Sequence, residues 1–330
     1  MTYARIAGIG SFLPEKVVTN QDLETTMDTS DEWIRERTGI KRRHIAVDGE
    51  TTSSMGLIAA RRAMDSAGVG PDDIDLIVLG TATPDKIFPA TACIIQRQLG
   101  VKGCPAFDVH AACSGFLYGL DLANRFIRTN GARTALVIGS ETLSRITDWQ
   151  DRGTAVLFGD GAGAVVLEAS DEPGILATHI HADGEYEELL QVEQGVSVGF
   201  DVTRAGGAYI KMEGNAVFRR AVATFDNIAR ETVADLDGHL DDIDWFVPHQ
   251  ANMRIIKAAA KKLNMPMDRV VATVDEHANT SGASIPLALD VAIGDGPIQR
   301  RQTLLLAAFG AGFTWCSAML RYGERASEPK

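Results

Sequence analysis

Cysteine is scarce in this chain, which has four cysteines, Cys93, Cys104, Cys113 and Cys316, among 330 residues. No two of them form a Cys-x-x-Cys pair, and the seven histidines show no zinc-ligand spacing. We therefore expect neither a disulfide framework nor a metal site, and unpaired thiols suit a reducing cytoplasm.

Long apolar runs and an excess of positive charge are also missing. No apolar stretch approaches the roughly 18 residues that a membrane-spanning helix needs. The first residues lack the charged leader and apolar core of a signal peptide, so we expect a cytoplasmic protein. The net charge of −12 argues against nonspecific binding to nucleic acid or to an anionic membrane, but it still permits a local basic patch for an acidic partner.

What the sequence does contain is an alternation of strand-like and helix-like segments. Nearly continuous apolar runs at 75–81 and 134–140 are typical of strands buried on both faces, and residues 51–67 and 89–99 show helical patterns. Residues 156–167 suggest two strands joined by a glycine turn. Such alternation predicts an α/β fold, in which helices pack on sheets.

The second half of the chain repeats the first. Residues 72–78 return at 241–247, an offset of 169, and residues 108–115 return at 275–282, an offset of 167. A period of this length is too long for a solenoid, so it predicts a duplicated α/β unit.

The boundary between the two units is expected where Asp-Glu-Pro-Gly at 171–174 interrupts the pattern. We predict an N-terminal half at 1–172, which carries Cys113, and a C-terminal half at 173–330, which carries His249 and Asn279. Duplication would place equivalent turns face to face across a pseudo-twofold axis, and a cleft at that junction is the expected ligand site.

Cys113 follows an apolar run at 106–109 and precedes a helical pattern that begins near Gly115. Backbone N–H groups and the positive end of a helix dipole favour the thiolate at such a junction. They predict a cysteine pKa lowered from about 8.5 toward roughly 7 or below. Taken by itself, the cysteine is more simply interpreted as a buried structural thiol.

Three further elements lie at the ends of apolar runs. His249 closes a predicted buried strand, Asn279 lies in the turn that repeats the Cys113 turn, and Gly310-Ala311-Gly312 separates two apolar runs. The two glycines allow backbone N–H groups to approach a developing oxyanion. Taken singly, these elements also fit a core histidine, a capping asparagine and a plain hairpin turn.

Together, a cysteine, a histidine and an asparagine support covalent acyl chemistry. A thioester would acylate Cys113, and His249 and Asn279 would stabilise an enolate formed by decarboxylation. Papain-like hydrolases use the same trio but carry the cysteine near the mature N-terminus, in a different signature. The glycines at 159–163 do not form a dinucleotide site, because a strand follows them instead of a helix.

These motifs resemble those of the thiolase superfamily, and most closely the β-ketoacyl-acyl-carrier-protein synthase III family. The resemblance covers essentially the whole chain and rests on residues 112–116, 248–252, 279–286 and 309–315. It implies a thiolase-like five-layer αβαβα fold of two duplicated halves, and a homodimer.

The resemblance implies the condensation that initiates type II fatty-acid synthesis. An acyl-CoA, with acetyl-CoA as the expected primer, acylates Cys113. Malonyl-acyl-carrier protein then decarboxylates and condenses, which gives 3-oxoacyl-acyl-carrier protein, CO2 and CoA. The CoA thioester is a substrate, and no cofactor is implied.

The resemblance also implies roles for individual residues. Cys113, His249 and Asn279 are the implied catalytic residues, and the backbone N–H groups of Cys113 and Ala311 form the oxyanion hole. Phe88 is implied at the floor of the partner subunit's acyl pocket. The implied CoA-binding residues are Thr29, Trp33, Arg37, Arg152 and Asn252, and the implied carrier-protein docking residues are Gln250, Ala251, Asn252, Met253 and Arg254.

Two positions depart from the family pattern. The family usually has three consecutive glycines where this chain has Ala311 in the middle, which adds a methyl group beside the oxyanion N–H. His110 stands where a small residue is common. One interpretation is that it perturbs Cys113, and the favoured one is a packed structural histidine.

Other functions remain open at this point. One is a sibling condensing enzyme for long-chain or secondary-metabolite acyl thioesters, and another is a cysteine acyl-CoA thioesterase. The intact Cys113, His249 and Asn279 make a non-catalytic acyl-binding homologue an inferior explanation. Asn279 also excludes relatives whose third catalytic residue is His, Cys or Glu, and chalcone-synthase-type enzymes are longer.

Overall fold

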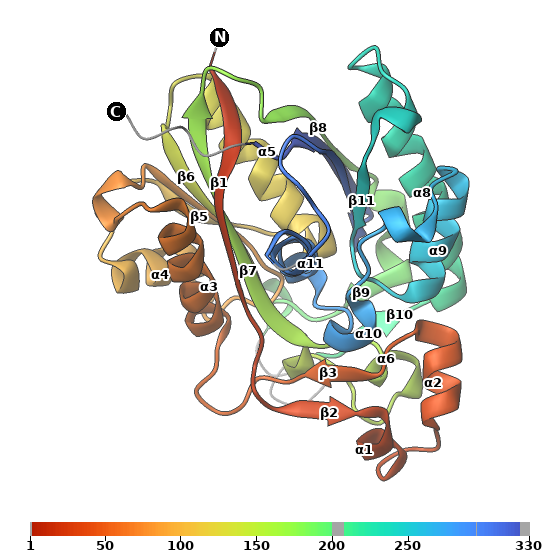
Figure 1. The fold of residues 1–330 in the computed structure, drawn as a ribbon. Helices are drawn as coiled ribbons and strands as arrows, with labels where there is room; N and C mark the ends of the chain where they lie inside the picture. Colours follow the sequence, from red (N-terminus) through yellow and green to blue (C-terminus); the bar gives the residue numbers. More distant parts are fainter. Residues whose placement is uncertain (1, 200–207, 295, 324–330) are drawn as a thin grey trace.

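Two β-sheets form the centre of the computed structural model, which describes residues 2–199, 208–294 and 296–323 (Figure 1). β4 runs parallel to both of its neighbours in the first sheet, and β7 runs antiparallel to β6 and β1. In order across the sheet, its strands are β1 (Tyr3–Phe12), β7 (Asp160–Ser170), β6 (Thr134–Thr142), β4 (Leu76–Gly80) and β5 (Ala106–Val109).

The second sheet has four strands, of which the first two are parallel and the others antiparallel. Its order is β11 (Trp245–Pro248), β12 (Thr303–Gly310), β13 (Thr314–Arg321) and β8 (Ile175–Ala182). The strands of the first sheet all precede those of the second in the chain. The predicted division into halves at 172/173 stays a prediction.

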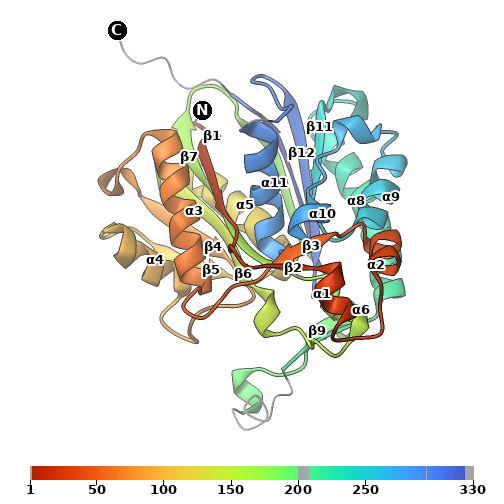
Figure 2. The same ribbon diagram turned by 60° about the horizontal axis from the view of Figure 1, so that its bottom comes forward.

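Helices cover both sheets and fill the space between them, which gives five layers (Figures 1 and 2). The predicted αβαβα fold is confirmed. The outer face of the first sheet is covered by α3 (Thr52–Ala67) and α4 (Thr91–Leu99). The central layer holds α5 (Gly115–Arg128) and α11 (Ser284–Ile293), and α8 (Gly214–Ala234) and α9 (Met253–Lys262) cover the second sheet.

Burial on both faces explains the continuous apolar runs. Every residue of β4 is buried, because helices pack on each side of the first sheet. The close approach of the central layer to the first sheet also requires a glycine in β6. A Cβ atom on Gly139 in β6 would overlap the carbonyl group of Gly282, so this glycine allows the turn before α11 to lie against the strand.

Short elements surround the layers. β2 and β3 pair antiparallel and, with α1 and α2, form an N-terminal flap beside α9 and α10 (Figure 2). The short strands are β2 (Val17–Thr19), β3 (Arg42–His44), β9 (Leu190–Val192) and β10 (Ile210–Met212). The short helices are α1 (Asn20–Glu24), α2 (Asp31–Thr38), α6 (Arg152–Ala155) and α10 (Val274–His277).

The internal repeat is present, but its second offset was predicted wrongly. The 3₁₀ turn η2 (Ala112–Ser114) leads into α5, and η8 (Ser281–Ala283) leads into α11. The two turns begin 169 residues apart, and so do the two helices. Ala112 and Ser281 both have positive φ, of 45° and 49°. The sequence match at 167 aligned similar letters, whereas the backbone pairs Ala112 with Ser281.

The two-strand interpretation of residues 156–167 was also wrong. β7 begins at Asp160 and continues to Ser170 as one strand. Phe158, just before it, makes an isolated β-bridge to Asn279. Gly161 and Gly163 therefore lie inside a strand that pairs with β1 on one side and β6 on the other, and Gly159 lies just before it.

Candidate active site

One cavity of about 240 Å³ is lined by Cys113, His249 and Asn279 together. The three side chains come from three different loops: η2 before α5, the end of β11, and the segment between α10 and η8. Leu157, Phe158, Phe309 and other apolar side chains complete the inner wall. The structure therefore brings together the trio that the sequence singled out.

Cys113 is half-buried at the centre of η2, immediately before α5. The pKa of its thiol is raised to about 12, mainly by burial; the Ser281 hydroxyl opposes this shift and the nearby Glu141 adds to it. The prediction of a lowered pKa is wrong, because removing the thiolate from water outweighs the local hydrogen bonds. The Cys113 thiol is therefore neutral at physiological pH.

His249 is 1% exposed and is held on both sides. Its backbone N–H donates to the Ala307 carbonyl at 2.8 Å, and its Nδ1 lies 2.7 Å from the Ser284 hydroxyl. The Phe309 ring packs edge-on against the imidazole, with centroids 5.9 Å apart. Burial lowers the pKa of His249 to about 3, so the ring is neutral at physiological pH.

Asn279 is fixed through both its backbone and its side chain. Its N–H donates to the Leu157 carbonyl at 2.9 Å, and its carbonyl accepts the Gly159 N–H at 3.0 Å. The side-chain Oδ1 accepts the Ser281 N–H at 2.9 Å. Because Oδ1 faces this donor, the amide NH2 group remains as the hydrogen-bond donor of this side chain.

The glycine turn after β12 lies directly against the nucleophile turn. A Cβ atom on Gly310 would lie 2.8 Å from the Cys113 nitrogen and 3.0 Å from the Ala111 oxygen. The Thr314 hydroxyl donates to the Ala111 carbonyl at 3.0 Å, which ties the two turns together. Gly312 has a φ of +135°, which a side chain would strain. Ala311 thus lies in a turn fastened to Cys113.

Gly310→Ala tests this close approach. The added methyl group would overlap the backbone of the nucleophile turn, so we expect a loss of about 1–3 kcal/mol of unfolding free energy. We also expect at least tenfold slower acylation of Cys113, because the thiol would shift. Gly184→Ala is the matched control, since nothing lies within 4 Å of its Cβ position. Denaturant unfolding and the intact-protein mass would be measured for both variants, and equal behaviour would contradict the prediction.

The predicted CoA residues gather around Trp33. The guanidinium groups of Arg37 and Arg152 lie 4.4 and 4.6 Å from the centre of the Trp33 ring. Arg152 also donates to the Asp28 carbonyl at 2.8 Å. Thr29, next in the chain, has a buried hydroxyl without a hydrogen-bond partner in the described part of the structure. Arg37 and Asn252 line the cavity, so this cluster adjoins its entrance.

Two predictions fall outside the cavity of this chain. Phe88 is 83% exposed and precedes α4, and its predicted role in the partner subunit's acyl pocket stays a prediction. His110 is exposed in the single chain, so it is not packed against other residues of its own chain as the sequence suggested. The reason is its place after β5, which is the last strand of its sheet and has a neighbour on one side only.

The predicted docking segment is only partly at the surface. Gln250 is 1% exposed, and its side chain bonds the Pro248 and Val271 carbonyls and the Thr273 N–H. Ala251 is also buried. The docking prediction for these two residues is corrected, because a side chain spent on internal hydrogen bonds is unavailable to a partner. Asn252 and Met253 are partly exposed and Arg254 is exposed.

Glu141, Ser281 and Ser284 also contact the site through hydrogen bonds, although no pattern in the sequence assigned a role to them. A carboxylate directly after the predicted buried strand 134–140 was a usable signal for Glu141. The two serines resemble ordinary turn residues in the sequence, and only the packing of η8 against η2 places them beside Cys113 and His249.

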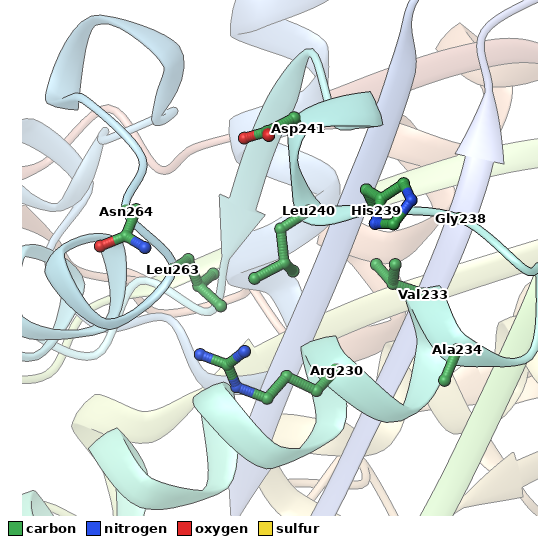
Figure 3. A pocket seen from close by; sticks show the side chains of 9 residues that line it. All are labelled: Arg230, Val233, Ala234, Gly238, His239, Leu240, Asp241, Leu263 and Asn264. Atoms are coloured by element: carbon green, nitrogen blue, oxygen red, sulfur yellow. The ribbon is translucent and has the colours of Figure 1, made fainter.

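A larger hollow of about 430 Å³ lies elsewhere, at the carboxyl end of α8 (Figure 3). Its polar side chains, Arg230, His239, Asp241 and Asn264, include none of the predicted site residues. Within residues 2–199, 208–294 and 296–323, no three His, Cys, Asp or Glu side chains are placed to hold a metal ion. None of the described helices is long and apolar enough to cross a membrane.

Two stretches of the chain match one enzyme family. Residues 107–184 match 3-oxoacyl-[acyl-carrier-protein] synthase III, and residues 234–322 match its C-terminal part. The β-ketoacyl-[acyl-carrier-protein] synthase III of Thioalkalivibrio sulfidiphilus is 60% identical over 322 residues, which cover 98% of this chain and 100% of the relative. This chain belongs to the synthase III family.

Solved structures of synthase III enzymes have the same fold. The enzyme from Aquifex aeolicus superimposes with a TM-score of 0.91 at 46% identity, covering 97% of this chain and 100% of that one. The priming β-ketosynthase of the R1128 polyketide pathway gives 0.93 at 36% identity, covering 98% and 97%.

As a synthase III, the protein is an acyltransferase that performs the initiating condensation of fatty-acid synthesis, which confirms the predicted function. The polyketide enzyme is the more distant relative of the three, so the secondary-metabolite alternative is not favoured. The thioesterase alternative is not favoured either, since these relatives carry the names of synthases.

Proposed function

We propose that this condensing enzyme uses an acyl-CoA, with acetyl-CoA as the primer, and malonyl-acyl-carrier protein as its two substrates. The observation that carries the proposal is the single cavity lined by Cys113, His249 and Asn279. A nucleophile and two neutral hydrogen-bond groups in one desolvated cavity suit two successive acyl steps. The reaction uses no cofactor, since the thioesters supply the activated carbon.

In the first step, the Cys113 sulfur attacks the thioester carbonyl and CoA leaves. The backbone N–H groups of Cys113 and Ala311 stabilise the oxyanion of the tetrahedral intermediate. Support comes from the fastening of the glycine turn to η2 through Thr314. Preorganised N–H donors in a water-poor site need little rearrangement as the negative charge develops.

In the second step, the malonyl group loses CO2 and its enolate attacks the acyl-cysteine. His249 and the Asn279 amide stabilise the enolate oxygen as neutral donors. Support comes from their fixed orientations: the His249 Nδ1 is paired with Ser284, and the Asn279 Oδ1 with the Ser281 N–H. Both side chains therefore present their remaining N–H groups from rigid positions.

CoA is proposed to enter past the flap and to stack its adenine in the cluster of Trp33, Arg37 and Arg152, with Thr29 and Asn252 nearby. Aromatic and guanidinium faces at 4.4 and 4.6 Å are suited to stacking on a planar base. The guanidinium groups also complement the phosphates of CoA.

The acidic carrier protein is proposed to dock on α9, where Asn252, Met253 and Arg254 reach the surface. Arg254, Lys257 and Lys261 are exposed and recur at spacings of three and four residues, which places them on one side of the helix. A local basic surface beside the cavity suits an acidic partner despite the net charge of −12.

Arg254→Glu is expected to raise the KM for malonyl-acyl-carrier protein by about tenfold or more at low salt and to change the acylation rate by acyl-CoA very little. Rim charges act mainly on association, so the effect should shrink as the salt concentration rises. Lys102→Glu, an identical charge change at an exposed position three residues after α4, is the control. A similar rise in KM for Lys102→Glu would contradict docking on α9.

A cytoplasmic homodimer is proposed as the working form. β5 is the last strand of its sheet, and Ile87 and Phe88 are 57% and 83% exposed on the segment before α4. A bare sheet edge and an exposed aromatic side chain are features that a second copy would cover, and Phe88 would then reach the partner's pocket. All four cysteines are free, as suits the cytoplasm.

The deciding experiment is intact-protein mass spectrometry after mixing with acetyl-, butyryl- or isobutyryl-CoA, followed by malonyl-acyl-carrier protein. An acyl adduct at Cys113 that is discharged into 3-oxoacyl-carrier protein is the expected result. An adduct that only water removes would indicate a thioesterase instead. Native mass measured on the same sample tests the dimer.

A further inference from the structure

Glu141, near the end of β6, is a fully buried carboxyl group that the proposed steps leave without a role. Its oxygens accept hydrogen bonds from the hydroxyls of Thr81, Thr83 and Ser281, at 3.2, 2.7 and 3.0 Å. The Ala82 N–H adds contacts of 3.0 and 3.1 Å. These donors are all uncharged. Burying a carboxylate with neutral partners alone is costly, so its presence here calls for a chemical explanation.

Ser281 connects this carboxyl to the nucleophile. Its hydroxyl donates to Glu141 Oε1 at 3.0 Å, and it lies on η8, which packs against η2, near enough to the Cys113 thiol to lower the pKa of that thiol. The next residue, Gly282, lies in the same gap, because a Cβ atom there would be 3.3 Å from the Ala112 oxygen and 3.4 Å from Glu141 Oε1. The two equivalent turns η2 and η8 thus bring the thiol, the hydroxyl and the carboxyl into one cluster.

The nucleophile needs a proton acceptor. The pKa of Cys113 is raised to about 12 and that of His249 is lowered to about 3, so the thiol does not ionise by itself and the imidazole is a weak base. Burial raises the pKa of Glu141 to about 7, which is the range in which a general base works best at physiological pH.

We propose that Glu141 receives the proton of the Cys113 thiol through the Ser281 hydroxyl during acylation and returns it by the same route after condensation. The inference rests on the proposed function, because the nucleophile is Cys113 in both. Glu141 and Ser281 thus form a proton relay that serves the Cys113 thiol.

The proton and charge balance at each step. As sulfur attacks the thioester, the S–H proton moves to Ser281 Oγ while the Ser281 proton moves to Glu141, and CoA leaves as a thiolate that solvent protonates. Glu141 is then neutral. When the enolate attacks the acyl-cysteine, the carbon–sulfur bond breaks and the Cys113 thiolate regains its proton through Ser281. Glu141 becomes a carboxylate again.

The direction of the pH dependence follows from this order. Only ionised Glu141 accepts a proton, so acylation should rise with pH through about 7 and level off above it. Thr81, Ala82 and Thr83 face the carboxyl from the segment after β4, Ser281 and Gly282 from η8, and Cys113 from η2. Of these groups, only Cys113 titrates, and His249 across the cavity stays neutral over this range.

Glu141→Gln is the main test, because the Thr81 and Thr83 hydroxyls can turn to accept from its amide. We expect acylation by acetyl-CoA to slow by about 10²-fold, with the inflection near pH 7 lost. Decarboxylation of malonyl-acyl-carrier protein should stay within a few-fold of the wild-type rate. Asp160→Asn, which also removes a fully buried carboxyl that bonds a serine hydroxyl, is the matched control and should keep the wild-type pH profile.

Two results would overturn the relay. If Glu141→Gln acylates as fast as the wild type, or faster, the carboxylate acts only as a repelling charge on the thiol. If acylation and decarboxylation fall in parallel, Glu141 has a structural role. Ser281→Ala provides a second test that keeps the carboxyl, and an unchanged acylation rate and pH profile in this variant would also refute the relay.

Alkylation of Cys113 by iodoacetamide separates this inference from the proposed function. It needs no acyl substrate, so its pH profile reports on the relay even if the wild type were to accept no acyl-CoA. We expect the alkylation rate to rise through about pH 7 in the wild type and to lack that inflection in Glu141→Gln. A profile shared by both proteins would refute the relay, whereas a missing acyl adduct alone would refute the proposed function.

Discussion

Replacing Cys113 by serine is expected to lower the rate of acylation by acetyl-CoA by about 10⁴-fold or more. A serine hydroxyl has an intrinsic pKa well above that of a thiol, and burial at this turn already raises the pKa of the thiol to about 12. An alkoxide at the same place would be formed far less readily. Stopped-flow mixing followed by intact-protein mass spectrometry measures the effect.

Cys93→Ser is the matched control for this substitution. Cys93 is also a half-buried free thiol, but it lies on α4 and donates to the Ala106 carbonyl at 3.3 Å, outside the cavity. Its acylation should match that of the wild type. Condensation by Cys113→Ser at more than a few per cent of the wild-type rate would show that another group is the nucleophile.

Asn279→Ala is expected to slow the decarboxylation of malonyl-acyl-carrier protein by about 10²–10³-fold, the usual effect of removing one preorganised donor to an oxyanion. Acylation of Cys113 should change only a few-fold, because the enolate arises after this step. A small effect on acylation is expected, since the Ser281 N–H loses its acceptor. Release of labelled CO2 and formation of the acyl adduct would be measured separately.

Asn215→Ala controls for a general disturbance of the cavity. Asn215 carries the same amide and lines the same cavity from α8, but it is exposed and belongs to none of the proposed steps. Its decarboxylation rate should stay near that of the wild type. Equal losses of acylation and decarboxylation in Asn279→Ala would contradict the separate role given to this amide.

The layered fold could be predicted because its signals are local and repeated. Buried strands such as β4 and β6 give continuous apolar runs, and the duplicated segments before β4 and β11 share nearly the same residues. The prediction failed where the alignment of the two halves rested on the spacing of similar residues alone. The turn before α11 was displaced by two residues, because letters were aligned there without knowledge of the backbone conformation that Ala112 and Ser281 share.

The gathering of Cys113, His249 and Asn279 in one cavity could be predicted from their motifs, whereas the electrostatics of the site could not. The helix start suggested a low pKa for Cys113, but burial of the thiol by tertiary packing reverses this direction. Glu141, which adds to the shift, and Ser281, which opposes it, are also distant in the sequence. Likewise, the motif that contains Gln250 gives no indication that its side chain is spent on internal hydrogen bonds. Tertiary packing decides which side chains of a motif are buried, and the motif itself does not show this.

The shared backbone shape of η2 and η8 has a consequence for how such an enzyme can evolve. A left-handed conformation at Ala112 and at Ser281 costs about 1–2 kcal/mol in each turn, so both copies of the ancestral unit retained an unfavourable geometry. Once duplicated, the two turns were free to diverge in chemistry while keeping one architecture. One copy now carries the thiol, and the other surrounds it with an amide and a hydroxyl. Neither copy alone contains Cys113, His249 and Asn279 together, so the cavity that they line exists only where the two copies pack against each other.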